Sequence, residues 1–276
     1  MRSFTYLFLF LGFITACNSV KDVQSSSQPV THELWDALVK THVSESGVVN
    51  YDGFVQDKAK LQNYLDLISK AHPNETNWTK NEQLAYWLNA YNAFTVKLIV
   101  DDYPINSIKD VKKGIPFINT VWDIKFIKIE GAKYDLNNIE HGIIRPKFKD
   151  PRIHFAANCA AISCPRLRKE AYTAENLDSQ LDDQARYFLR NLGKNNITAE
   201  QVKLSKILKW YGGDFNEYGG VRKFVNDYGP HKFPNSVDIE YLDYLWPLNN
   251  QDINTCLLYT SPSPRDATLS RMPSSA

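Results

Sequence analysis

The side chains best suited to chemistry lie in one run of the sequence, residues 153–165 (Ile-His-Phe-Ala-Ala-Asn-Cys-Ala-Ala-Ile-Ser-Cys-Pro). This run contains Cys159 and Cys164, and the other cysteines of the chain, Cys17 and Cys256, lie near its two ends. A catalytic cysteine must lose its proton, because the thiolate and not the thiol is the nucleophile. The cysteine pair is therefore the first place in this chain to look for covalent chemistry.

Histidines and a carboxylate that can assist a thiolate stand upstream of the pair. His154 belongs to the same run, and Glu140 is followed directly by His141. An imidazole can take the thiol proton, and an acidic or amide side chain can fix the imidazole. This set predicts a thiol-dependent hydrolase or acyl transferase, including transglutaminase-like crosslinking, with a backbone N–H near the cysteine stabilising the oxyanion. Asn158 and Arg145 are its candidate substrate-binding groups.

Two other interpretations of the same residues stay open. In an oxidising compartment Cys159 and Cys164 can form a structural disulfide, which would make the domain a binding or scaffold module of the envelope and not an enzyme. The pair could also ligate a metal ion together with His141 and His154, but the four residues between the cysteines are more than the usual two. We therefore expect neither a metal ion nor another cofactor.

Within the pair, the sequence favours Cys159 as the nucleophile. Asn158 and the small residues after Cys159 predict a turn of helix, whose N-terminus would lower the pKa of that thiol. Pro165, in contrast, removes a backbone donor beside Cys164. The cysteine that the fold brings nearer to an imidazole would take this role.

One strongly apolar helix must position these groups. Thr79 and Glu82 form a capping box, and the residues from 83 to 100 contain a single charged side chain. A helix that is apolar on nearly all sides is buried on nearly all sides. Asn89 and Asn92 share one face of it, so their amides either brace neighbouring loop backbone or line a polar cleft as substrate-binding groups.

Shorter elements surround this helix. Asp135 can cap a short helix that contains Glu140, and residues 152–157 are typical of a short buried strand. The run 210–215 predicts aromatic packing around a turn, although Asp214 could orient an imidazole. Further helices are predicted over 31–43, 58–68, 174–191, 206–211 and 221–228, with a hairpin at 124–134 and a strand at 201–204. The order predicts an α+β fold, a single mainly helical domain with a buried central helix and a small mixed or antiparallel sheet.

A family resemblance is carried by the runs 85–93, 139–145, 153–165, 171–177 and 208–215. Together they resemble the domain of unknown function family 547, which occurs in exported bacterial proteins and in plants. The resemblance covers about residues 75–225, and the cysteine run is its most specific part. Residues 244–249 are similar to the closing segment of the family, except that Leu245 replaces an acidic residue. The family has no established reaction, so the resemblance leaves the activity open.

The N-terminus predicts export and lipid attachment. One positive charge precedes an apolar stretch over residues 4–14 that is too short to span a bilayer. The residues Ile-Thr-Ala before Cys17 resemble the lipobox of bacterial lipoproteins. We expect residues 1–16 to be a signal peptide and residues 17–30 a tether. Lipidated Cys17 would then hold the protein on a membrane of the bacterial cell envelope, in the periplasm or at the outer membrane.

The C-terminal residues and the net charge limit the extent of the domain and the kind of partner that we expect. Residues 256–276 follow no helical or strand pattern and resemble the translation of a sequencing adapter. We therefore expect one globular domain over residues 31–255 and a disordered tail. The formal net charge of +1 gives no reason to expect nucleic acid as a partner. A peptide or another envelope component is the expected substrate.

Overall fold

The computed structural model describes residues 23–111 and 120–250. The predicted signal peptide, Cys17 and the tail at 256–276 lie outside the described residues. Of the expected tether, residues 23–30 have no regular secondary structure, and the carbonyl of Ser27 accepts hydrogen bonds from Asn74 and Trp78. Within the described ranges, no helix combines the length and the apolar character needed to cross a membrane.

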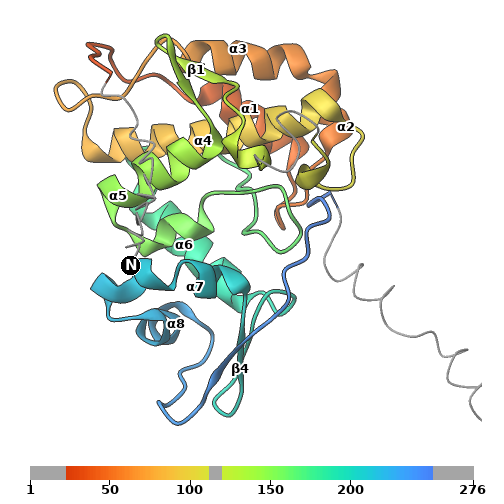
Figure 1. The fold of residues 1–276 in the computed structure, drawn as a ribbon, viewed down its shortest axis with the longest axis vertical. Helices are drawn as coiled ribbons and strands as arrows, with labels where there is room; N and C mark the ends of the chain where they lie inside the picture. Colours follow the sequence, from red (N-terminus) through yellow and green to blue (C-terminus); the bar gives the residue numbers. More distant parts are fainter. Residues whose placement is uncertain (1–22, 112–119, 251–276) are drawn as a thin grey trace, which may run out of the picture.

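The fold is α+β and mainly helical, as the sequence predicts (Figure 1). Its two small sheets are an antiparallel hairpin, β1 (Ile127–Ile129) with β2 (Ala132–Tyr134), and a mixed sheet in the order β3-β4-β5. In the mixed sheet β4 pairs with β3 antiparallel and with β5 parallel. The remaining elements are α1 (Glu33–His42), α2 (Tyr51–Gln56), α3 (Lys58–Ile68), α4 (Lys80–Asp102), η1 (Ile108–Asp110), η2 (Val121–Asp123), η3 (Asn138–Ile144), α5 (Arg145–Phe148), η4 (Pro151–Phe155), α6 (Leu177–Arg190), β3 (Asn196–Ile197), β4 (Val202–Leu204), α7 (Lys206–Trp210), η5 (Gly212–Tyr218), α8 (Val221–Tyr228) and β5 (Ile239–Tyr241).

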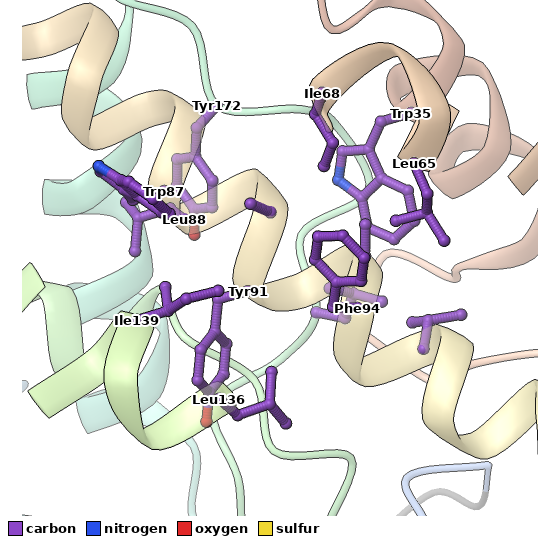
Figure 2. Packing of buried hydrophobic residues seen from close by; sticks show 14 of the residues in the cluster. Trp35, Leu65, Ile68, Trp87, Leu88, Tyr91, Phe94, Leu136, Ile139 and Tyr172 are labelled. Atoms are coloured by element: carbon purple, nitrogen blue, oxygen red, sulfur yellow. The ribbon is translucent and has the colours of Figure 1, made fainter. Parts of the chain in front are cut away.

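Helix α4 is the buried central helix that the sequence predicts. Its capping box is formed, because the backbone N–H of Thr79 donates to the Glu82 carboxylate at 2.7 Å and the Thr79 hydroxyl accepts from the Glu82 N–H at 3.3 Å. Figure 2 shows how its side chains pack: Phe94 lies beside residues of α1 and α3, and Tyr91 points toward Leu136 and Ile139. The helix therefore joins the N-terminal helices to the segment that carries Glu140.

The prediction of a strand at 152–157 is wrong. Residues Pro151–Phe155 form the 3-10 helix η4. The Asp150 side chain accepts a hydrogen bond from the Arg152 N–H at 2.9 Å, and Pro151 occupies the first helical position, where its missing donor costs nothing. These helix-start signals outweigh the short apolar run behind them.

The buried side chains fall into two clusters that meet just before the cysteine residues. One cluster surrounds α4, and the other lies among α6, α8 and the mixed sheet. Phe155 belongs to the second cluster and Ala156 to the first. The loop that follows, residues 157–165 (the cysteine loop), therefore begins at the junction of the two cores.

A segment from the far end of the chain covers the cysteine loop. From β5 the chain continues, and residues 244–249 (the closing segment) run toward α2 (Figure 1). The N–H of Ile162 donates to the carbonyl of Pro247 at 2.8 Å, and the N–H of Asn249 donates to the carbonyl of Ala160 at 3.0 Å. Two stretches more than eighty residues apart in sequence thus fix each other's backbone.

Candidate functional site

The residues that the sequence suggests for thiol chemistry line one cavity of about 320 Å³. They are Glu140, His141, His154, Cys159 and Cys164. The cavity lies where α4, η3, η4, α7, the cysteine loop and the closing segment meet. Its other large lining residues are aromatic: Tyr91, Trp122, Trp210, Tyr211, Tyr244 and Trp246.

The two cysteines are adjacent free thiols. Their sulfur atoms lie 2.6 Å apart, which is longer than the bond of about 2.05 Å in a disulfide. The backbone N–H of Cys159 donates to the sulfur of Cys164 at 2.8 Å, and the sulfur of Cys159 is 3.1 Å from the hydroxyl of Tyr244. Cys164 is buried, whereas Cys159 is partly exposed.

The surroundings favour the thiolate on Cys164. Burial acts to raise the pKa of Cys164, but hydrogen bonds from the thiol and the backbone N–H of Cys159 outweigh it, so the pKa lies below its ordinary value. The hydrogen bond to Cys164, together with burial, raises the pKa of Cys159. Of the two cysteines, Cys164 is therefore the one whose thiol loses its proton more readily.

The helical turn on which the choice of Cys159 rested is absent. Residues 157–159 form no regular structure, and Ala160 has a φ of 62°, in the left-handed region. The chain then makes a tight turn, in which the N–H of Cys164 donates to the carbonyl of Ala161 at 2.9 Å. The reason for preferring Cys159 is thus removed, and the hydrogen bonds favour Cys164 as the thiolate.

An ionised carboxylate fixes one of the two histidines. Asp214 accepts a hydrogen bond from Nε2 of His154 at 2.8 Å and two from Arg145, at 2.6 and 2.8 Å. The Arg145 guanidinium, and then His154, hold the pKa of Asp214 well below its ordinary value. With Nε2 donating to this carboxylate, Nδ1 is the acceptor nitrogen, and it makes no hydrogen bond to any residue that the structure describes.

Glu140 and His141 stand on an unusual helix. The segment η3 is a π-helix. This form is rare in proteins as a whole, but where it occurs it is often at a functional site. Glu140 is buried and accepts a hydrogen bond from the Tyr211 hydroxyl at 2.7 Å. His141 is exposed, and its Nδ1 lies 2.8 Å from Arg145. The Tyr211 ring also stacks on His154, at 4.0 Å between centroids, so Tyr211 connects the two sides of the site.

Three asparagines considered as substrate-binding groups hold backbone, which for Asn89 and Asn92 is the bracing alternative that the sequence left open. Asn89 exchanges hydrogen bonds with the backbone of Tyr172. Asn92 donates to the carbonyl of Ala156 at 3.0 Å and accepts from the N–H of Asn158 at 2.8 Å. Asn158 donates to the carbonyl of Pro165 at 2.6 Å and accepts from the N–H of Ala160 at 2.9 Å. Their amides are used by these bonds: Asn92 and Asn158 position the cysteine loop, whereas Asn89 holds the backbone at Tyr172. Arg145, the fourth predicted binding group, is paired with Asp214.

The four ligands considered for a metal ion do not converge. Among the residues described, no three His, Cys, Asp or Glu side chains are arranged to hold a metal. His154 directs Nε2 to Asp214, and His141 directs Nδ1 to Arg145. In this arrangement neither sulfur forms a hydrogen bond to an imidazole of the described chain. Catalytic contacts of this kind are often long without substrate.

Sequence reasoning missed the closing segment as a part of the site. Tyr244 contacts Cys159, and Trp246 forms a wall of the cavity. These residues reach the cysteine loop only through contacts across more than eighty positions. The one available signal was the cluster of aromatic residues at 244–246. For the run 210–215 the sequence favours aromatic packing around a turn, and it gives Asp214 the role of an orienting carboxylate only as an alternative.

Residues 75–189 match the model of a family described as "Protein of unknown function, DUF547". No curated protein and no solved structure matches the chain. The similarity that the sequence motifs suggest is therefore confirmed for this range, which includes Glu140, His154 and both cysteines. Asp214 and the closing segment lie beyond it. The family description names no activity.

Proposed function

We propose that this cavity is the active site of a thiol-dependent hydrolase or acyl transferase. The observation that carries the proposal is that a cysteine pair and an imidazole held by an ionised carboxylate line the same cavity. Nucleophile, base and orienting group are the three parts that thiol catalysis requires. Acyl groups of peptides or other envelope components are the substrates that this chemistry would take.

In the proposed reaction Nδ1 of His154 takes the proton of a cysteine thiol, and the resulting thiolate attacks the carbonyl carbon of an ester or amide. The bond from that carbon to the leaving group breaks, and the leaving group takes a proton from the His154 imidazolium. Water, or another nucleophile, then attacks the thioester while His154 accepts its proton at Nδ1, and the thiolate leaves. Asp214 keeps the imidazole oriented and stabilises its charged form throughout.

An ester with a coloured leaving group tests this proposal. Reduced full-length protein mixed with p-nitrophenyl acetate should release p-nitrophenolate in a burst equal to the protein concentration, and mass spectrometry should find the acetyl group on Cys159 or Cys164. The single variants Cys159→Ser and Cys164→Ser identify the acylated sulfur. A protein that shows neither a burst nor an adduct does not have this function.

The adjacency of the sulfurs favours a second function, a scaffold domain braced by a disulfide. Oxidation would join the two sulfurs, with two protons released and two electrons passed to an oxidant such as oxidised glutathione. Treatment with iodoacetamide before and after reduction separates the two functions. Alkylation that occurs only after reduction means that the pair is bridged, whereas rapid alkylation without reductant supports the thiol function.

We also propose that the protein is attached to a membrane of the bacterial envelope through lipidated Cys17. The support is the lipobox-like sequence before this cysteine. The variant Cys17→Ala should lose lipid labelling and appear in the soluble fraction after cell lysis. A variant that stays in the membrane fraction would contradict the anchor.

A further inference from the structure

The proposed thiol reaction leaves one part of the cavity unexplained, its cluster of aromatic rings. The rings of Trp122, Trp210, Tyr244 and Trp246 form what we term the aromatic wall. Centroids of adjacent rings are 4.6 Å apart for Tyr244 and Trp246, 4.9 Å for Trp210 and Tyr244, and 5.6 Å for Trp122 and Trp246. Trp210 is 51% exposed, which is unusual for a side chain with so much apolar surface to bury.

The cavity also contains a carboxylate with unused hydrogen-bonding capacity. Glu140 is only 8% exposed. Oε1 accepts from Tyr211, whereas Oε2 has no hydrogen-bond partner in the described part of the chain. No Lys or Arg among the described residues lines this cavity, and the nearby guanidinium of Arg145 is paired with Asp214. The hydroxyl of Tyr211 is neutral, so the charge of Glu140 has no cationic partner among the described residues that line the cavity, and a cation from outside would supply one.

The aromatic wall already holds an ammonium group on one of its rings. Nζ of Lys109 lies 3.6 Å from the centroid of the Trp246 ring, although Lys109 does not line the cavity. The face of an indole attracts cations because of its quadrupole. This contact within the chain shows that the ring of Trp246, one member of the wall, packs against an alkylammonium group.

We propose that the cavity binds a primary alkylamine, with its ammonium group between Glu140 and the aromatic wall. This inference rests on the proposed function, because the amine would be the acyl acceptor. The ammonium gives one proton to Nδ1 of His154, and its nitrogen attacks the thioester carbon. The nitrogen gives its second proton to solvent water as the C–S bond breaks, which yields an amide and restores the thiolate.

Titration with n-butylammonium, followed by tryptophan fluorescence, tests the site. The neutral n-butanol has the same chain length and serves as the comparison ligand. Both ligands are titrated into the wild type and into the Cys159→Ala/Cys164→Ala variant, in which no covalent step is possible. Glu140→Gln removes the charge and keeps the shape, and Glu217→Gln, an exposed carboxylate outside the cavity, is the matched control.

We expect saturable binding of n-butylammonium, roughly ten-fold tighter than that of n-butanol. Glu140→Gln should weaken it by a similar factor, and Glu217→Gln should not. Trp210→Ala, at a half-exposed position that tolerates truncation, should weaken it several-fold even if Glu140→Gln does not fold. Equal affinity for the neutral ligand, or unchanged affinity in Trp210→Ala, overturns the proposal. Binding of n-butylammonium in a protein that shows no burst with p-nitrophenyl acetate would support the amine site and contradict the proposed thiol function.

Discussion

Replacing Asp214 by Asn is the sharpest test of the proposed site. The substitution preserves the shape of the side chain but removes the charge that binds Arg145 and His154. It also allows the amide N–H of the new side chain to face Nε2 of His154. Because two donors cannot bond to each other, Nε2 must then lose either its proton or this hydrogen bond. The variant should therefore affect both the orientation of the imidazole and the free energy of unfolding.

The structure sets the size of both effects. Hydrogen bonds to charged groups contribute about 1.5–3 kcal/mol each, but Arg145 and Asp214 are 29% and 28% exposed, so water offsets part of the loss. We expect a decrease of about 2 kcal/mol in the free energy of unfolding at neutral pH. An incorrectly oriented imidazole should slow the ester burst by roughly 10²–10⁴-fold.

The pH dependence gives an independent check. Since the pKa of folded Asp214 lies below its value in the unfolded chain, the carboxylate stabilises the fold above the unfolded value of about 3.9. That stabilisation is lost as the pH falls through the lowered pKa of the folded state. The difference in unfolding free energy between wild type and Asp214→Asn should thus be constant near neutral pH and shrink below pH about 4.

Urea denaturation over a pH series and the burst rate with p-nitrophenyl acetate measure these quantities. Glu217→Gln is the control, because Glu217 stands on the same helix, is exposed and pairs with Lys149 at 3.2 Å. It should change the free energy of unfolding by less than about 1 kcal/mol. A burst rate in Asp214→Asn equal to that of the wild type would refute the role given to the Asp214–His154 pair.

Further outcomes concern the cysteine loop and its surroundings. In Cys164→Ala the pKa of Cys159 should fall toward its ordinary value, because its hydrogen bond to Cys164 is gone, and iodoacetamide should alkylate it faster at pH 7 than in the wild type. Asn158→Ala leaves buried backbone groups unpaired and should cost about 3 kcal/mol in urea denaturation. Gly47→Ala should destabilise more than Gly131→Ala: both have positive φ, but only at Gly47 would a Cβ lie 2.8 Å from backbone.

Much of the helical framework could be predicted from local signals. The capping box at Thr79, the apolar run behind it and the Gly-containing turn of the hairpin each depend on residues within a few positions, and the structure contains all three. Helix α2 was missed because it has only six residues and no long apolar stripe. The parallel pairing of β5 with β4 was missed because the strands lie far apart in sequence and each is three residues long.

The candidate site shows the same limit more strongly. Cys159 and Cys164 could be selected by residue type alone, since few side chains are nucleophiles. The preference for a thiolate on Cys164 could not be predicted in this way. It depends on the left-handed backbone at Ala160, after which the chain enters the turn before Cys164. Alanine has no side-chain signal for that conformation, which is normally occupied by glycine or asparagine.

The cysteine loop has no helix or strand of its own, so its shape must come from its neighbours. Asn92 of α4 holds its start, and the closing segment pairs with its middle through Ala160 and Ile162. Tyr244 of the same segment then reaches the sulfur of Cys159. Residues 75–189, the range similar to a known family, supply the sulfurs and the imidazole, but not the Asp214 carboxylate or three of the four rings of the aromatic wall. The site of the proposed thiol chemistry therefore includes residues from the last part of the described chain, which covers the cysteine loop.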